Sequence, residues 1–101
     1  MSLTTGQVLI RPRAESDLIE IWFYIVEQNK DDRVADRFLN QVEAHFASIL
    51  RNPGIGISAD QLALGLRRSI YKNYLVFYTT QGADIVIVRV LHHARDWENV
   101  F

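Results

Sequence analysis

Residues 12–52 decide the fold of this chain, and they read PRAESDLIEIWFYIVEQNKDDRVADRFLNQVEAHFASILRN. Apolar side chains recur there at the spacing of one helical face, first over residues 12–28 and again over residues 32–52. The apolar positions are Ala14, Leu18, Ile21, Trp22 and Ile25, then Ala35, Phe38, Leu39, Val42, Phe46, Ile49 and Leu50. Asp31 or Asp32 is suited to cap the second helix. Because so few residues separate the helices, they are predicted to form an antiparallel hairpin.

Four segments around the hairpin have the β-branched and apolar composition of strands. They cover residues 7–11 before the hairpin and residues 66–71, 75–80 and 84–91 after it. The last three are joined by short turns and follow a loop over residues 53–65, so they are predicted to form a three-strand meander. Residues 84–91 are apolar on both faces, which favours a central position in the sheet.

This order predicts a single α+β domain over residues 1–101. Its N-terminal strand is followed by an antiparallel helix hairpin, which packs on one face of a mainly antiparallel sheet. The C-terminal three-strand meander completes that sheet. Trp97, Val100 and Phe101 end an otherwise polar tail, which is therefore expected to pack back on the domain or to bind a partner.

The composition is typical of one globular domain and excludes several classes of protein. The chain has 101 residues, of which 49% are hydrophobic and 23% charged, so a disordered chain is excluded. The absence of Cys excludes disulfides, a thiolate zinc site and a Cys nucleophile. The sequence has neither an apolar run of membrane-spanning length nor a signal peptide, so we expect a cytoplasmic protein that does not bind membranes.

The charge balance argues against direct, sequence-specific binding of nucleic acid. Eleven Lys and Arg residues oppose twelve Asp and Glu residues, which gives a net charge of −1, whereas nucleic-acid-binding domains are usually strongly basic. The charges are unevenly divided, because residues 1–50 carry a net −3 and residues 51–101 a net +2. Nine of the eleven cations are Arg, which suits planar recognition of carboxylate or phosphate groups.

A cationic set on the predicted sheet and tail is the first candidate binding site. Its members are Arg67, Arg68, Lys72, Arg89 and Arg95. Arg89 interrupts an apolar strand, and strict alternation places it on the face of Ile85, Ile87 and Leu91. Two interpretations stay open: Arg89 forms an internal salt bridge with a carboxylate of the tail or of a helix, or the basic sheet face binds an acidic partner.

The first predicted helix carries more apolar residues than one core stripe needs. Ile19 and Phe23 lie beside the stripe, next to Trp22 and Tyr24. Either the stripe is wide, or the helix presents a second apolar surface that binds another chain.

Motifs for metal or cofactor chemistry are absent from the sequence. No Gly-rich phosphate loop, nucleophile elbow or metal-spaced ligand cluster is present. His92 and His93 are adjacent, so at a strand end they are expected to point to opposite sides and not to bind one metal ion together. We expect neither a metal nor a cofactor.

Six segments, in order and with matching spacing, follow the pattern of one known family. They are residues 13–25 (RAESDLIEIWFYI), 35–38 (ADRF), 50–56 (LRNPGIG), 65–68 (GLRR), 74–78 (YLVFY) and 89–96 (RVLHHARD). On these residues the chain resembles the ParE-type toxins of ParD–ParE toxin–antitoxin systems, in the RelE/ParE superfamily. Such systems serve plasmid stabilisation or stress responses.

The resemblance implies a toxin that inhibits DNA gyrase and traps it on cleaved DNA. It also implies a ParD-like antitoxin, which wraps a segment around the hairpin and sheet, and a homodimer or a heterotetramer with that antitoxin. We assign target binding to Arg67, Arg68, Arg89 and Arg95, and antitoxin binding to Ile19, Trp22 and Phe23. The resemblance implies no catalytic residue and no cofactor.

The alternative within the superfamily is a RelE-like, ribosome-dependent mRNA endonuclease. That chemistry needs a base for a ribose 2′-OH, which His92 or His93 would supply, and cations for the phosphate. The cations would be Arg67, Arg89 and Arg95. The net charge of −1 favours the gyrase inhibitor, because ribosome binding depends on phosphate neutralisation. A third alternative is a domain that still binds the antitoxin but is no longer toxic.

Overall fold

The computed structural model describes residues 6–94 and 99–101. Its elements are β1 (Val8–Ile10), α1 (Pro12–Asn29), α2 (Asp32–Arg51), a short 3₁₀ helix (Pro53–Ile55), β2 (Ile57–Ser58), β3 (Arg67–Tyr71), β4 (Tyr74–Gln81) and β5 (Asp84–His92). The predicted helices and strands are all present, and their ends differ from the predicted ones by no more than one residue. β2 lies inside the segment that the sequence predicts as a loop. A strand of two residues is too short to show the alternation by which strands are predicted.

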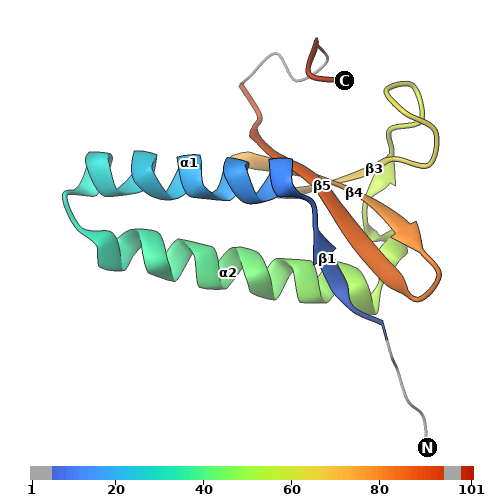
Figure 1. Cartoon of the computed structure of the whole chain (residues 1–101), viewed down its shortest axis with the longest axis horizontal. Coiled ribbons are helices and arrows are strands. Elements are labelled where there is room, and N and C mark those ends of the chain that lie inside the picture. Colours follow the sequence, from blue (N-terminus) through green and yellow to red (C-terminus); the bar gives the residue numbers. More distant parts are fainter. Residues whose placement is uncertain (1–5, 95–98) are drawn as a thin grey trace, which may run out of the picture.

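The helical hairpin forms for local reasons. Pro12 is the first residue of α1, where its missing N–H removes no helical hydrogen bond. Lys30 ends α1 in the left-handed conformation with a φ of 54°, and its N–H donates to the Val26 carbonyl at 2.7 Å. Asp31 caps α2, since its carboxylate accepts the Arg33 N–H at 2.9 Å. The helices consequently lie side by side next to the sheet (Figure 1). Across the described ranges, no helix combines the length and the apolar character needed to cross a membrane.

The five strands form one mixed sheet in the order β1–β5–β4–β3–β2. β3, β4 and β5 form the predicted antiparallel meander, and β1 pairs in parallel with β5, with Leu9 opposite Val86. β5 therefore lies inside the sheet, which confirms the prediction from its apolar composition. The fold is two helices packed on a five-stranded α+β sheet, as predicted.

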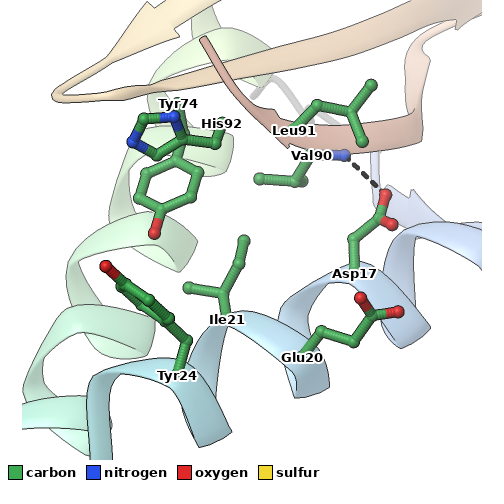
Figure 2. A pocket seen from close by; sticks show the side chains of 8 residues that line it. All are labelled: Asp17, Glu20, Ile21, Tyr24, Tyr74, Val90, Leu91 and His92. Atoms are coloured by element: carbon green, nitrogen blue, oxygen red, sulfur yellow. Dashed lines mark hydrogen bonds between the residues drawn. The ribbon is translucent and has the colours of Figure 1, made fainter. Parts of the chain in front are cut away.

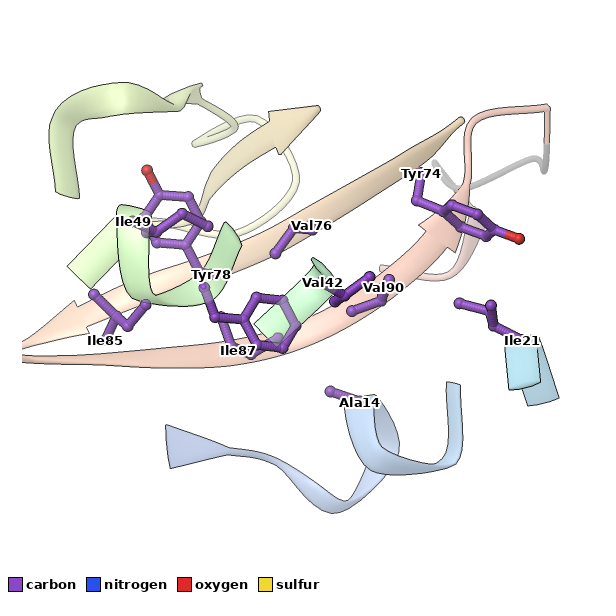
Figure 3. Close-up of a cluster of buried hydrophobic side chains, with 11 residues drawn as sticks. Ala14, Ile21, Val42, Ile49, Tyr74, Val76, Tyr78, Ile85, Ile87 and Val90 are labelled. Carbon is purple, nitrogen blue, oxygen red and sulfur yellow. The ribbon is translucent and has the colours of Figure 1, made fainter. Parts of the chain in front are cut away.

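Both faces of the sheet are covered, and they carry separate cores. The cluster facing the helices is drawn in Figure 3 and includes Val42, Phe46 and Ile49 from α2 with Val76, Tyr78, Ile85 and Ile87 from the sheet. The cluster on the other face contains Ala59, Leu66, Leu75, Phe77 and Leu91. Val100 packs against this second cluster, and the Phe101 ring lies 4.8 Å from the Phe77 ring. The end of the tail thus packs back on the domain, whereas Trp97 lies outside the described residues.

A β-bulge in β5 changes which residues share a face. Phe77 pairs with Arg89 and Tyr78 pairs with Ile87, so Val88 has no partner in β4. Ile87 accordingly belongs to the helix-side cluster and Leu91 to the opposite one. The predicted common face is therefore wrong for Ile85 and Ile87, because the extra residue shifts the alternation. Arg89 and Leu91 do share a face, since they are in register with Phe77 and Leu75 of the second cluster.

Candidate functional site

A buried ion pair joins α1 to β5. The Arg89 guanidinium donates through Nε and Nη2 to the two Asp17 carboxylate oxygens, at 2.8 and 2.9 Å. Asp17 is 6% exposed and Arg89 is 7% exposed. Hydrogen bonding to Asp17 raises the pKa of Arg89 and outweighs the opposing effect of burial. Of the two interpretations of Arg89, the structure has the internal salt bridge, and its partner is a helix carboxylate.

The same carboxylate completes the hydrogen bonding of β5. β1 ends at Ile10, and the next N–H, of Arg11, still donates to the Ile87 carbonyl at 3.0 Å. Beyond Ile87, β5 continues but β1 no longer pairs with it. The Val90 N–H on this edge of β5 donates to the Asp17 carboxylate at 2.9 Å. A side chain of α1 thus supplies the acceptor that a neighbouring strand would otherwise supply.

Next to the ion pair, a pocket of about 340 Å³ opens between α1 and the adjoining ends of β4 and β5. Its lining residues are Asp17, Glu20, Ile21 and Tyr24 from α1, Tyr74 from β4, and Val90, Leu91 and His92 from β5. Figure 2 shows the Tyr24 and Tyr74 hydroxyls pointing toward one another on one side, with the Asp17 and Glu20 carboxylates on the other side. We call this site the α1–β5 pocket. It combines carboxylates, phenols and an imidazole.

Aromatic contacts hold the Tyr74 wall of the α1–β5 pocket in place. The Tyr74 ring lies 5.3 Å from the Phe38 ring and meets the His92 ring edge-on at 5.4 Å. Burial raises the pKa of the Tyr74 hydroxyl, and Tyr24 adds to this effect. Tyr74 is therefore a neutral hydrogen-bonding group at physiological pH.

His92 and His93 lie on the same side of the chain, which contradicts the expectation that they point apart. Their rings stack with centroids 4.8 Å apart and an interplanar angle of 22°. β5 ends at His92, and the His93 N–H already donates to the Asn73 carbonyl at 2.8 Å, so strand alternation no longer applies. Among the described residues, no three His, Asp or Glu side chains gather in a way that could hold a metal ion.

The three described arginines of the predicted target face lie in different surroundings. Arg68 and Arg89 are both in register with Phe77, but the Arg89 side chain is directed to α1. Arg67 Nη2 donates to the carbonyls of Gly54 and Gly56, so this side chain fastens the turn before β2. Arg68 is half-buried and lines a pocket at the β2–β3 edge. Arg95 lies outside the described residues, and target binding by these arginines stays a prediction.

The outer face of α1 is apolar and open to solvent. Ile19 is 57% exposed and Phe23 62% exposed, and Tyr24 beside them is also exposed. Trp22 is half-buried, and its Nε1–H donates to the Asp36 carboxylate of α2 at 2.8 Å. We call Ile19, Trp22 and Phe23 the α1 apolar face; it is not part of the core.

Three polar residues in or at the edge of the interior, Asp17 and the pair His45–Ser69, were not singled out from the sequence. Asp17 lies on the buried stripe three residues after Ala14 and four before Ile21, and this spacing is the signal that could have revealed it. The His45 Nε2 atom lies 2.8 Å from the Ser69 hydroxyl oxygen, and burial lowers the pKa of His45. No pattern in the sequence pairs these two residues, since they come from α2 and β3.

Comparison with known proteins identifies the family. The model of the ParE toxin of type II toxin–antitoxin systems (parDE) matches residues 8–97. Toxin ParE1 of Caulobacter vibrioides is 33% identical over 82 residues, which cover 81% of this chain and 83% of that toxin. Toxin ParE1 of Mycobacterium tuberculosis is 28% identical over 93 residues, covering 91% and 94%. The chain therefore belongs to the ParE toxins of type II toxin–antitoxin systems.

Solved structures share the fold. A chromosomal ParDE system from P. aeruginosa is similar with a TM-score of 0.65 at 18% identity, over 86% of this chain and 95% of the other. The toxin–antitoxin complex RelBE2 from Mycobacterium tuberculosis is similar with a TM-score of 0.65 at 21% identity, over 93% and 98%. The two-helix hairpin on a five-stranded sheet is thus the RelE/ParE-like fold.

Proposed function

We propose that this toxin inhibits DNA gyrase and that a ParD-like antitoxin neutralises it. The observation that carries the proposal is the match to the ParE toxin family over residues 8–97. The net charge of −1 supports a protein target over ribosomal RNA, because phosphate neutralisation supplies most of the affinity for nucleic acid.

The α1 apolar face is the proposed antitoxin site. Ile19 and Phe23 are more than half exposed and lie one helical turn apart, so an amphipathic segment would cover both. Trp22 lies against Phe23, with ring centroids 5.2 Å apart and the rings perpendicular. Large apolar side chains of this kind are typical anchors of protein interfaces.

Target binding is proposed for the arginines of the C-terminal half. Arg68 lies at the β2–β3 edge beside the exposed Ile57 and Ile70, which gives a mixed cationic and apolar surface. Arg95 is assigned to target binding from the sequence alone, because it lies outside the described residues. Arg67 and Arg89 act in this proposal through the turn and the helix that they hold, rather than by direct contact.

A supercoiling assay tests the proposed target. Purified toxin is added to gyrase and relaxed plasmid, and we expect loss of supercoiling together with accumulation of cleaved DNA. Unchanged supercoiling at large molar excess, combined with cleavage of mRNA on added ribosomes, would replace this proposal by the endonuclease, with His92, His93 and Arg95 as its first candidates. A folded toxin inactive in both assays would be the non-toxic, antitoxin-binding domain.

A further inference from the structure

The two carboxylates that line the α1–β5 pocket differ in their partners. Both oxygens of Asp17 are engaged by Arg89 and Val90. Glu20 lies one turn further along α1 and lines the same pocket, yet within the described ranges its carboxylate has neither an ion pair nor a hydrogen bond. Glu20 also acts on Arg89 electrostatically. Glu20 is exposed to solvent at this pocket and, unlike Asp17, has no counter-ion among the described residues.

The opposite wall of the pocket offers hydrogen-bond acceptors beside aromatic surface. The Tyr24 and Tyr74 hydroxyls point toward one another there (Figure 2). Tyr74 is buried and held between Phe38 and His92, so its hydroxyl is fixed in place before any partner arrives. Phenol oxygens accept N–H donors, and aromatic rings favour a nearby cation.

We propose that the α1–β5 pocket receives one arginine side chain of a protein partner, with Glu20 as its counter-ion and Tyr24 and Tyr74 as acceptors. A guanidinium has five N–H donors in a fixed plane, which matches a carboxylate on one side and two hydroxyls on the other. The volume of about 340 Å³ lies at the small end of ligand-sized pockets, which suits one long side chain.

The α1 apolar face adjoins the pocket, because Glu20 of the pocket and Phe23 of that face are three residues apart on α1 and so are neighbours on its surface. This inference rests on the proposed antitoxin site for the identity of the partner. A segment that covers Ile19 and Phe23 would place a neighbouring arginine at the pocket entrance. The chemistry of the pocket itself can be tested without any antitoxin.

The test is an NMR titration of the full chain with N-acetyl-arginine methylamide, and with the citrulline analogue as a neutral probe of nearly the same shape. We expect saturable shifts of Tyr24, Tyr74 and residues 90–92 with the arginine probe. The affinity should be about tenfold lower with citrulline, as for loss of a charged hydrogen bond. Glu20→Gln should produce the same loss, and Glu27→Gln, which removes a charge from α1 outside the pocket, should not.

Equal binding of arginine and citrulline, or no saturable shift, would overturn the proposal. An equal loss in Glu20→Gln and Glu27→Gln would overturn it as well, because the effect would then be long-range electrostatics. Failure to inhibit gyrase does not affect this titration, so the pocket and the proposed target can fail independently.

Discussion

The Asp17 carboxylate and the Arg89 guanidinium form a two-point ion pair between α1 and the interior strand β5, with both side chains less than a tenth exposed. The Val90 N–H binds the same carboxylate. Removing either side chain leaves the other as an uncompensated buried charge, a situation that proteins tolerate poorly.

We predict that Asp17→Ala and Arg89→Ala each lower the free energy of unfolding by about 3–5 kcal/mol. Urea denaturation followed by circular dichroism measures this loss. The double variant Asp17→Leu with Arg89→Met should lose less than the two single changes together, because it leaves no lone charge. Additive losses in the double variant would contradict the coupling. Arg89→Glu is expected not to fold, so a toxicity assay of that variant would not test whether Arg89 contacts the target.

A second prediction concerns the turn before β2. The Tyr78 hydroxyl accepts the Gly56 N–H at 3.0 Å and donates to the Pro53 carbonyl at 2.7 Å, at a buried position. Tyr78→Phe leaves both backbone groups without this partner and should lower stability by about 1–3 kcal/mol. Tyr71→Phe is the control, because that hydroxyl makes one exposed contact with Gln41 at 3.3 Å. Equal losses in the two urea titrations would refute the role of Tyr78.

A third prediction concerns pH. Burial lowers the pKa of His45 below its ordinary value of 6.5. The unfolded chain therefore binds a proton below that pH while the folded chain does not, and stability falls as the pH decreases through this window. His45→Gln should reduce the difference in unfolding free energy between about pH 7.5 and about pH 5.5. His93→Gln, at an exposed ring, is the control. A full difference retained in His45→Gln would contradict this assignment.

A fourth prediction separates antitoxin binding from stability. Ile19→Ser and Phe23→Ser change exposed side chains, so the unfolding free energy should shift by no more than about 0.5 kcal/mol. Calorimetric titration with a ParD-like antitoxin should show weaker binding for both variants, while gyrase inhibition persists. Leu64→Ser is the matched control, since Leu64 is 93% exposed on a loop away from α1. Unchanged antitoxin affinity would exclude the α1 apolar face.

The two helices and the interior strand β5 could be predicted because their patterns are local. Helical spacing marks the buried faces of α1 and α2, and residues apolar on both faces mark β5. The partner of Arg89 could not be assigned, because it depends on pairing between residues that lie 72 positions apart. The unpaired Val88 likewise follows from the register with β4, which no local pattern reveals.

The candidate site shows the same division. The spacing from Ala14 to Ile21 can place Asp17 on the buried face, but it cannot name the cation that Asp17 meets. The stacking of His92 on His93 depends on where β5 ends, and the sequence fixes that point only to within a residue or so. Sequence patterns therefore do not predict which side chains meet at the ends of helices and strands.

The position of β5 has a consequence for how this toxin is made. Among the described strands, β5 is the last in sequence and lies between β1 and β4, and residues 8–10 find their partners only in residues 85–87. Pairings between distant residues form late in folding. A product truncated before residue 84 therefore lacks the middle of its sheet and the cation for Asp17. The folded domain therefore cannot form until residues 84–92 have been synthesised, however early residues 8–10 appear.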